Sequence, residues 1–368
     1  MHVHCASMGE VNAAAPLIKQ LLKTYPELSL VVTNSTPTGA QQVEKLFAGQ
    51  VIQLMAPLDS WDASRRFSQA LQPRLSLFTE VEIWPNWLAS IKSTGATLIL
   101  INARLSENSL RSYQKFATLF KPALACFDVI AAQNKTYQAR YQAFNRNIQI
   151  CGNLKFDIQL DERLPEQIIQ LHSQHHLKRK IWIAASVHPG EYEIIIAAHQ
   201  KILQQFPDAL LIVAPRHSER FVQVAQYLKK ESHFNFVLRS QASTVEAHTQ
   251  VWLLDSLGEL MQFYALADIA FVGGSLVNRG GHNPLEPAAL GKPILMGPKQ
   301  NNCADMCATL AAAGAFKTVS DVTQIADSVI DYWLSDTLLH QASVAANEVV
   351  MINQGAVQKT MSVINDLA

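Results

Sequence analysis

Apolar runs of strand length alternate with helix-length segments along the whole chain. This alternation is typical of parallel sheets covered by helices on both faces. Two separate series of such runs, without a short repeat, predict two doubly wound α/β domains. The predicted strands are residues 28–33, 76–79, 97–101, 181–185, 209–214, 234–238, 251–254, 269–273 and 293–296. Helical patterns between them cover residues 11–25, 191–206 and 219–230.

A polar stretch at residues 157–166, which contains Pro165, predicts the boundary between the two domains. We therefore assign residues 1–158 to an N-terminal domain and residues 159–330 to a C-terminal domain. Residues 331–368 carry only helical signals and are predicted to form C-terminal helices, and their crossing back to the N-terminal domain stays open. The first residues already have the pattern of a strand end, which suggests that further residues precede them.

Composition and charge narrow the class of protein. With 49% hydrophobic residues, the chain can bury enough apolar surface to fold, which excludes an intrinsically disordered protein. Because 30 Lys and Arg balance 30 Asp and Glu, no nucleic-acid partner is expected. The five cysteines include no Cys-x-x-Cys pair, which favours reduced thiols and no zinc site. No apolar run approaches the roughly 18 residues of a spanning helix, and no signal peptide opens the chain.

Glu10 directly follows the first predicted strand, at the edge where doubly wound sheets bind ligands. A carboxylate in the first turn of a helix is expected to stay ionised, because the helix N-terminus favours negative charge. An ionised carboxylate in a cleft can act as a general base. The spacing Ser7-x-x-Glu10 also matches a capping box, in which Glu10 folds back on the Ser7 amide. The two roles do not exclude each other.

Two further loops of the N-terminal half follow predicted strands. Residues 34–39 form a hydroxyl-rich loop that suits an anionic group or a sugar, or that simply caps a helix. Glu80 and Glu82 end the strand at 76–79, and alternation sends both to one side unless the strand has already ended. Two close carboxylates need cations or sugar hydroxyls to remain ionised. The alternative is a pair of solvated charges at a strand end.

Two basic residues are also candidates. Lys155, within residues 152–157, is placed to face a cleft between the domains. Arg216 follows the strand at 209–214, where its guanidinium fork would match a phosphate. Taken alone, each residue is more typical of an ordinary surface side chain.

The strongest motif combines four glycines with a helix start. Gly273-Gly274 and Gly280-Gly281 precede the segment His-Asn-Pro-Leu-Glu at 282–286. Glycines beside a helix N-terminus let a phosphate approach closely, and a carboxylate in the first turn can accept both ribose hydroxyls. Capping explains Asn283 as N-cap, Pro284 as the first helical residue and Glu286 as the third. It does not explain the glycines.

Together these motifs resemble the 3-deoxy-D-manno-octulosonic acid (Kdo) transferases of lipid A assembly, over nearly the whole chain and in the same order. The segments that carry the resemblance are residues 7–10, 79–86, 102–106, 152–157 and 280–287. The last segment is also similar to the donor site of GT-B glycosyltransferases at large. The resemblance implies a GT-B fold, in which two Rossmann-like domains face each other across a cleft. It implies an N-terminal domain for the acceptor and a C-terminal domain for the donor, CMP-Kdo.

Carried over by position, the resemblance implies Glu10 as the catalytic base. It implies Glu80 and Lys155 as transition-state stabilisers, with Glu82 as the less favoured alternative to Glu80. The residues implied as CMP ligands are Pro215, Arg216, Leu257, Gly258, Glu259, Asn283, Pro284, Leu285 and Glu286. The implied reaction is inverting transfer of Kdo from CMP-Kdo to a lipid A precursor, lipid IVA, at the cytoplasmic face of the inner membrane. No cofactor and no metal are expected, and the chain contains no Asp-x-Asp pair.

Other classes of protein are weighed against this one. A GT-B enzyme for a different nucleotide sugar is the nearest alternative. A nicotinamide dehydrogenase would need a Gly-x-Gly-x-x-Gly turn after its first strand, and this chain has Ser-Met-Gly-Glu there. A non-catalytic two-lobed binding protein would normally be secreted, and no export signal is visible.

Members of the resembled family usually carry an N-terminal apolar anchor, which this chain lacks. Either the chain is truncated or a surface of the N-terminal domain is expected to meet the membrane. The best candidate surface is residues 58–67, where a helix capped by Asp59 or Ser60 would place Trp61 and Arg65 on one face. The alternative is that Trp61 and Phe67 pack inward.

Overall fold

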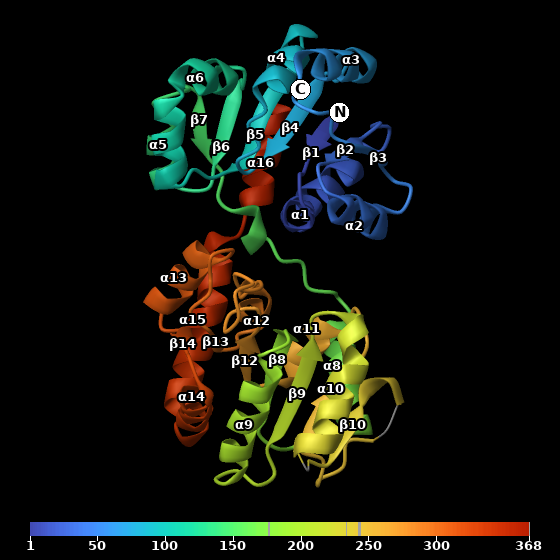
Figure 1. Ribbon diagram of the computed structural model, residues 1–368, viewed down its shortest axis with the longest axis vertical. Coiled ribbons are helices and arrows are strands. Elements are labelled where there is room, and N and C mark those ends of the chain that lie inside the picture. The colour runs from blue at the N-terminus through green and yellow to red at the C-terminus, as the bar shows by residue number, and fades with distance from the viewer. Residues whose placement is uncertain (176, 233, 242–243, 368) are drawn as a thin grey trace. The chain divides into compact units, whose positions relative to one another are not determined.

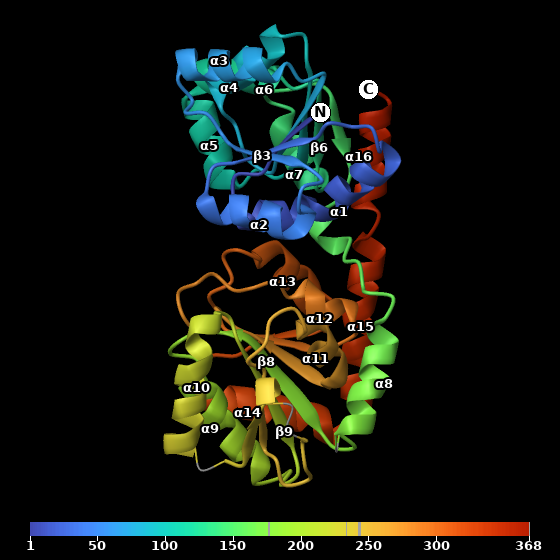
Figure 2. The same ribbon diagram turned by 90° about the vertical axis from the view of Figure 1, so that its right-hand side faces the viewer.

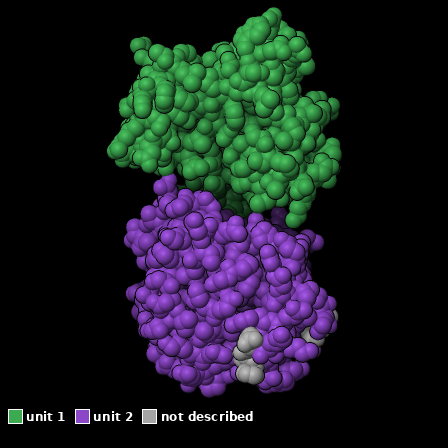
Figure 3. Space-filling view, in the orientation of Figure 1, with its two compact units in different colours: residues 1–159, 353–368 green, residues 160–352 purple. Residues whose placement is uncertain are grey.

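The structure, a computed structural model, describes residues 1–175, 177–232, 234–241 and 244–367. It forms two compact units. Unit 1 comprises Met1–Gln159 and Asn353–Ala368, and unit 2 comprises Leu160–Ile352 (Figure 3). Ala368, the last residue of the predicted C-terminal helices, lies outside the described residues.

The described part of unit 1 is built on a sheet of seven parallel strands in the order β3-β2-β1-β4-β5-β6-β7 (Figure 1). The strands are β1 (His2–His4), β2 (Val31–Asn34), β3 (Ile52–Met55), β4 (Leu75–Thr79), β5 (Thr97–Ala103), β6 (Val129–Ala132) and β7 (Ile148–Ile150). The chain starts at β1, moves outward through β2 and β3, and then returns to place β4 on the other side of β1. The strand order therefore reverses between β1 and β4.

Helices cover both faces of this sheet. They are α1 (Met8–Thr24), α2 (Pro37–Phe47), α3 (Trp61–Leu71), α4 (Pro85–Ser93), α5 (Glu107–Lys115), α6 (Ala117–Ala125), α7 (Lys135–Tyr141), the 3₁₀ helix η1 (Leu154–Phe156) and α16 (Ala356–Asn365). Leu77 and Ile99 pack with α1, α2 and α16 in one core, whereas Phe78 and Leu98 pack with α4 and α6 in the other. Strands that are buried on both faces carry the near-continuous apolar runs seen in the sequence.

The described part of unit 2 repeats this arrangement with seven parallel strands in the order β10-β11-β9-β8-β12-β13-β14. The strands are β8 (Ile181–Val187), β9 (Leu210–Pro215), β10 (Phe236–Leu238), β11 (Val251–Leu253), β12 (Ile269–Val272), β13 (Ile294–Met296) and β14 (Phe316–Thr318). Here the strand order reverses between β8 and β12.

Two layers of helices also cover the sheet of unit 2. The α-helices are α8 (Leu164–Gln174), α9 (Tyr192–Leu203), α10 (Phe221–Tyr227), α11 (Leu260–Leu266), α12 (Leu285–Ala289), α13 (Ala304–Ala312), α14 (Val322–Leu334) and α15 (Asp336–Asn353). Shorter turns are the 3₁₀ helices η2 (Ser218–Arg220) and η4 (Arg239–Gln241) and the π-helical turn η3 (Leu228–Ser232). Trp182 and Leu211 pack with α9 and α14, and Ile183 and Ile212 pack with α8 and α11.

The last helix, α16, belongs to unit 1, where it packs against α1 (Figure 1 and Figure 2). Val357, Met361 and Ile364 bury their side chains in the same core as α1. The carboxylate of Asp157 fixes the start of this helix, because it accepts hydrogen bonds from the amides of Gly355, at 2.6 Å, and Val357. A residue just before unit 2 thus holds the segment that follows unit 2.

The predicted α/β class is confirmed, and each strand predicted from an apolar run is present within a few residues. The sequence patterns missed β3, β6, β7 and β14. These strands have only three or four residues, and β3 is largely exposed, so they lack a long apolar run. The predicted helix at 219–230 is helical but divides into η2, α10 and η3. Across the described residues, the structure contains no helix with both the length and the apolar character needed to span a membrane.

Candidate active site

The candidate site of unit 1 lies where the strand order reverses. Glu10 stands in the first turn of α1, directly after β1, and Glu80 and Glu82 follow the end of β4. β1 and β4 are paired neighbours in the sheet. The carboxyl ends of neighbouring strands at such a reversal form the usual ligand site of a doubly wound sheet. The structure therefore brings the three predicted carboxylates to one edge.

Glu10 is held in a variant of the predicted capping box. Ser7 is the N-cap of α1, and its hydroxyl oxygen accepts a hydrogen bond from the Glu10 amide at 3.4 Å. The Glu10 carboxylate accepts from the backbone amide of Ala6 at 2.9 Å, rather than from that of Ser7. The hydroxyls of Ser7 and Thr79 contact its two oxygens at 3.0 and 2.7 Å. Glu10 therefore caps the start of α1 and is also held in a fixed position at the ligand edge of the sheet.

The expectation that Glu10 is firmly ionised is wrong. Burial raises the pKa of Glu10 to about 7, and the negative charge of Glu82 raises it further, against the hydrogen bonds from Thr79 and Ala6. The start of α1 does not offset the loss of hydration. A carboxyl with a pKa near 7 is partly ionised at neutral pH, and it is a much stronger base than an exposed glutamate.

Glu80 and Glu82 do not point the same way, because β4 ends at Thr79 and alternation stops there. Glu80 adopts a left-handed backbone conformation with φ of 53°. Its side chain is buried and forms ion pairs with Arg104 at 2.6 Å and Lys155 at 2.9 Å. Lys155 is half-buried by this pair, so within unit 1 it is more than a solvated surface lysine.

The two cations keep Glu80 ionised. Although burial works to raise the pKa of Glu80, Lys155 and Arg104 outweigh it and hold the pKa below its usual range. The sequence predicted that close carboxylates need cations, and Lys155 was among the candidates. Arg104 was missed as a site residue, although residues 102–106 are part of the resemblance. Its position directly after β5, the neighbour of β4, is the signal that could have found it.

Glu82 turns toward β1 instead. The indole N–H of Trp84 donates to its carboxylate at 2.8 Å, and Nε2 of His4 lies 3.5 Å from the same oxygen.

The hydroxyl-rich loop at 34–39, the other candidate of this half, acts as a cap. Thr36 is the N-cap of α2, and its hydroxyl oxygen accepts from the Gly39 amide at 3.1 Å.

The candidate site of unit 2 also lies where the strand order reverses. The segments that follow β8, β9, β11 and β12 meet at the carboxyl edge of the sheet, since all these strands are parallel. Together with Pro215, the last residue of β9, they contain all the CMP ligands implied by the resemblance. Arg216 follows β9, Leu257–Glu259 follow β11, and Asn283–Glu286 follow β12.

A buried carboxylate that the sequence reading missed holds the glycine-rich loop of unit 2. Glu191 is fully buried and accepts hydrogen bonds from the amides of Gly274, Ser275 and Leu276 at 2.8–3.0 Å. It also accepts from the amide of His188 at 2.9 Å. The loop after β12 is therefore tied to the turn after β8.

This attachment explains the first diglycine. A Cβ atom on Gly273 would lie 2.5 Å from the carbonyl oxygen of Ser186, and Gly274 has φ of 71°, where L-residues are strained. Gly280 and Gly281 also have positive φ. Gly273 is thus required by the close approach of two backbone segments, and the other three glycines by their left-handed backbone conformation, whether or not a ligand is bound.

Three histidines gather beside this loop. His188 and His282 are stacked with an interplanar angle of 6°, and their Nε2 atoms lie 2.8 Å apart. His217 packs edge-on against His188. Burial lowers the pKa of His188 to about 4 and that of His282 to about 3, and the nearby charge of Arg216 acts in the same direction. Both rings are therefore neutral at pH 7, and one Nε2 donates a hydrogen bond to the other.

The predicted helix start at 283–286 lies one residue later than expected. Helix α12 begins at Leu285, and Pro284 is its N-cap. Asn283 still caps it, because its side-chain oxygen accepts from the Leu285 amide at 3.1 Å. The Glu286 carboxylate lies 3.5 Å from the side-chain nitrogen of Asn283. Burial raises the pKa of Glu286, whereas Asn283 and Arg216 oppose this rise.

Other predicted ligands have structural partners of their own. Glu259 forms an ion pair with Arg239 at 2.8 Å and accepts from the Ser256 hydroxyl. The Leu257 side chain is exposed, and that of Leu285 is fully buried, so Leu285 could offer a ligand only its backbone. Among the described residues, no three His, Cys, Asp or Glu side chains form a group that could hold a metal ion.

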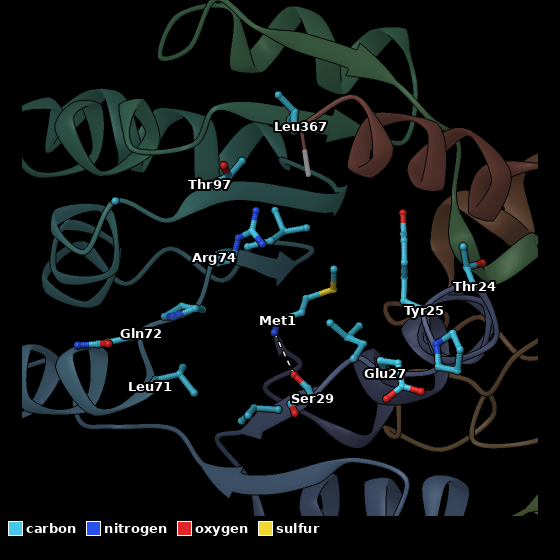
Figure 4. Close-up of a pocket in the computed structure, with 16 residues that line it drawn as sticks. Met1, Thr24, Tyr25, Glu27, Ser29, Leu71, Gln72, Arg74, Thr97 and Leu367 are labelled. Carbon is cyan, nitrogen blue, oxygen red and sulfur yellow. Dashed lines mark hydrogen bonds between the residues drawn. The ribbon is translucent and has the colours of Figure 1, made fainter.

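An apolar pocket of about 920 Å³ in unit 1 lies elsewhere (Figure 4). Its lining includes Met1, Ser29, Arg74 and Thr97, which stand at the amino ends of β1, β2, β4 and β5. In Figure 4 the Met1 ammonium donates to the carbonyl of Ser29, at 3.0 Å. This pocket is therefore at the opposite edge of the sheet from Glu10, and it does not belong to the candidate site.

Comparison with solved structures identifies the fold. A UDP-GlcNAc 2-epimerase from Neisseria meningitidis, bound to UDP-GlcNAc, matches all of both chains with a TM-score of 0.66 and 15% identity. Together with the two parallel sheets, this similarity shows a fold of the GT-B type.

The family follows from the sequence comparisons. A family model described as 3-deoxy-D-manno-octulosonic-acid transferase (kdotransferase) matches residues 1–158. A 3-deoxy-D-manno-octulosonic acid transferase from Haemophilus influenzae is 38% identical over 98% of this chain and 86% of its own. The C-terminal CMP-Kdo binding domain of WaaA from Acinetobacter baumannii is 33% identical, with a TM-score of 0.50 over 52% of this chain and 99% of that domain. This chain therefore belongs to the family of Kdo transferases, as its motifs suggested.

Removal of the Glu191 carboxylate tests the architecture of the glycine-rich loop. We expect Glu191→Ala to lower the free energy of unfolding of unit 2 by more than about 3 kcal/mol, because four amides, three of them buried, lose their carboxylate acceptor. Amide hydrogen exchange of Gly274, Ser275 and Leu276, measured by mass spectrometry, should accelerate. Glu193→Ala, at an exposed position in the first turn of α9, which Glu191 precedes, is the control. Equal exchange in both variants would contradict the assigned role.

Proposed function

We propose that this protein transfers Kdo from CMP-Kdo to the lipid A precursor lipid IVA, with inversion and release of CMP. The observation that carries the proposal is the Glu10 carboxyl, fixed at the ligand edge of unit 1 with a pKa of about 7. Membership of the Kdo transferase family supplies the identity of the transferred sugar. The similarity of unit 2 to a CMP-Kdo binding domain supports the choice of donor.

In this proposal Glu10 is the catalytic base. Its ionised form takes the proton of an acceptor hydroxyl while that oxygen bonds to C2 of Kdo. The bond between C2 and the phosphate oxygen breaks in the same step, and CMP leaves with the electron pair. A single displacement inverts the configuration at C2 and needs one base and no covalent intermediate.

Glu80 and Lys155 are proposed to stabilise the transition state. Lys155 lies 2.9 Å from Glu80 and presents a cation at the same edge as Glu10. The Kdo sugar carries a carboxylate, which a lysine can attract once the donor approaches. Glu80, shared with Arg104, fixes the position of the ammonium. A preorganised charge of this kind needs no rearrangement when the reaction occurs.

Unit 2 is proposed to bind the CMP part of the donor. Arg216, directly after β9, offers a guanidinium fork to the phosphate. Glu286, near Arg216 and Asn283, is placed to accept the ribose hydroxyls. Negative charge that grows on the leaving phosphate is met by Arg216 and backbone amides. The reaction is therefore proposed to need no divalent metal.

The direct test of this function is turnover. Purified protein is incubated with lipid IVA and CMP-Kdo, and products are identified by mass spectrometry. We expect Kdo-modified lipid, no transfer from UDP-sugars, and full activity in excess EDTA. Transfer of another sugar in place of Kdo, or strict dependence on Mg²⁺, would contradict the proposal.

The base assignment predicts the behaviour of Glu10→Gln. The amide cannot take up a proton at neutral pH, so we expect transfer to fall by about 10²-fold or more. For the unmodified protein, activity should rise as pH increases through about 7, because only ionised Glu10 is active. Thermal unfolding of the variant should stay close to that of the parent, since glutamine can still accept the Ala6 amide. Near-native turnover would leave Glu10 with a capping role alone.

The donor assignment predicts a selective loss of nucleotide affinity. Arg216→Ala and Glu286→Ala should each weaken CMP binding, measured by calorimetry, more than acceptor binding. Arg220→Ala, a nearby arginine that bonds to Gln223, is the matched control and should bind CMP normally. If neither Arg216→Ala nor Glu286→Ala changes CMP affinity, the nucleotide does not bind at this edge.

A surface of unit 1 is proposed to meet the inner membrane, where lipid IVA resides. Ser60 caps α3, and the side chains of Leu58 and Trp61 are 82% and 64% exposed. The guanidinium carbon of Arg65 lies 5.2 Å from the centre of the Trp61 ring. The alternative that Trp61 packs inward is wrong, although Phe67 does contact Trp87 in the core. An exposed Trp beside arginine suits a lipid headgroup layer.

This surface predicts weak binding that depends on salt. Each basic residue near an anionic bilayer contributes roughly 1 kcal/mol, so the protein should bind anionic vesicles at low salt and leave them at high salt. The double change Trp61→Ala with Arg65→Ala should reduce vesicle binding in co-sedimentation without changing CMP affinity. The control is Lys115→Ala with Phe116→Ala, which removes a similar exposed pair of unit 1. Equal binding by both variants would exclude α3 as the membrane contact.

A further inference from the structure

Two histidines of β1, His2 and His4, have no part in the proposed mechanism although they lie close to Glu10. Both are fully buried. The His2 ring bonds to the hydroxyls of Ser76, at 2.6 Å, and Thr33, at 2.9 Å. Nδ1 of His4 bonds to the same Thr33 hydroxyl, at 2.9 Å. Three of the four ring nitrogens are therefore satisfied within the sheet, and Nε2 of His4 is the fourth.

The remaining nitrogen faces Glu82. Nε2 of His4 has no hydrogen-bond partner among the described residues, and it lies 3.5 Å from Oε2 of Glu82. The indole N–H of Trp84 donates to the same oxygen at 2.8 Å. Buried polar atoms in folded proteins are rarely left without a partner. His4 and Trp84 together thus fix the Glu82 carboxylate at the end of β1.

Thr79 connects this group to Glu10. Its hydroxyl lies 2.9 Å from the carbonyl oxygen of His4 and 2.7 Å from Oε2 of Glu10. Glu10, Thr79 and His4 therefore form one connected cluster between β1 and β4, and Glu82 borders it. The negative charge of Glu82 acts on Glu10 across this cluster.

The charges around Glu10 single out Glu82. Glu80 and Glu82, in the loop after β4, both raise the pKa of Glu10 through their negative charges, and Glu82 has the larger effect. Glu80 is neutralised by Arg104 and Lys155. Glu82 has no lysine or arginine partner in the part of the chain that the structure describes.

The remaining neighbours do not compensate the charge of Glu82. The guanidinium of Arg104, which follows β5, feels the charge of Glu10 but is bound to Glu80 at 2.6 Å. The thiol of Cys5, at the end of β1, is neutral because burial raises its pKa well above the usual range. The phenol of Tyr113, in α5, is also neutral, because burial and then the charge of Glu82 raise its pKa. Glu82 is thus a negative charge that is held in place close to Glu10.

We propose that Glu82 is a positioning residue that strengthens Glu10 as a base, and that His4 and Trp84 hold it in place. This inference rests on the proposed function, in which Glu10 takes the acceptor proton. A fixed negative charge disfavours the ionised form of a neighbouring carboxyl, so the proton is taken up more readily. Glu82 need not touch either substrate to act in this way.

The test is the pH dependence of kcat/KM for Glu82→Gln. Glutamine removes the charge but can still accept the indole N–H of Trp84. We expect the acid limb of the pH–rate profile to move to lower pH by about 1 unit, because the negative charge of Glu82 no longer raises the pKa of Glu10. The rate on the plateau should fall about three- to tenfold, because Glu10 becomes a weaker base. A residue that only supports the fold would lower the rate without moving the limb.

Two further variants complete the experiment. Glu107→Gln is the control, because Glu107 is an exposed carboxylate of unit 1 that pairs with Arg111. This variant also removes one negative charge and should leave the acid limb in place. Trp84→Phe keeps the charge of Glu82 but removes the N–H that holds it, so its limb should move down by a smaller amount. It decides the matter if Glu82→Gln does not fold.

The outcomes separate this inference from the proposed function. If the unmodified protein does not transfer Kdo, the proposed function fails. If the unmodified protein does transfer Kdo, the inference alone is overturned when the acid limb of Glu82→Gln stays at the same pH. If Glu82→Gln does not fold, an unmoved acid limb in Trp84→Phe overturns it.

Discussion

Buried carboxylates that bind the ends of several strands at once are the interaction on which both candidate sites depend. In unit 1, Glu80 joins the loops after β4 and β5 to the 3₁₀ helix η1 through Arg104 and Lys155. In unit 2, Glu191 joins the turn after β8 to the loop after β12 through backbone amides. A charge taken out of water must be fully paired. Each of these carboxylates therefore dictates where its neighbours lie.

The three glutamates of unit 1 show how partners set the chemistry of identical side chains. Glu80 has two cations and remains ionised despite its burial. Glu10 has only hydrogen-bond donors and a negative neighbour, so its pKa rises to about 7. Glu82 is held by an indole N–H and faces a histidine. Glu80 is thus a fixed anion, Glu10 a carboxyl with a pKa near neutral pH, and Glu82 a charge that helps to raise that pKa.

The sequence predicted features that depend on local pattern. The apolar runs identified the α/β class, and the Ser7-x-x-Glu10 spacing predicted both a cap and a ligand-edge carboxylate. Residues that act across long separations were missed, because periodicity carries no signal for them. Arg104 is 24 positions from Glu80, and Gly274 is 83 from Glu191. The ionisation of Glu10 was misjudged since burial by β1 and β4 is a tertiary effect. The glycines were read as ligand contacts, whereas the backbone approach at Ser186 already requires Gly273.

Burial and the nearby charge of Glu82 prepare the Glu10 carboxyl to exchange a proton near neutral pH. Its titration can be followed directly in this chain by ¹³C NMR of glutamate labelled at the carboxyl carbon, with the Glu10→Gln variant to assign the signal. We expect one carboxyl signal that titrates near pH 7 and is missing from the variant. If the Glu10 signal instead titrates with the exposed glutamates, near their ordinary pKa of about 4.3, the base assignment loses its physical foundation.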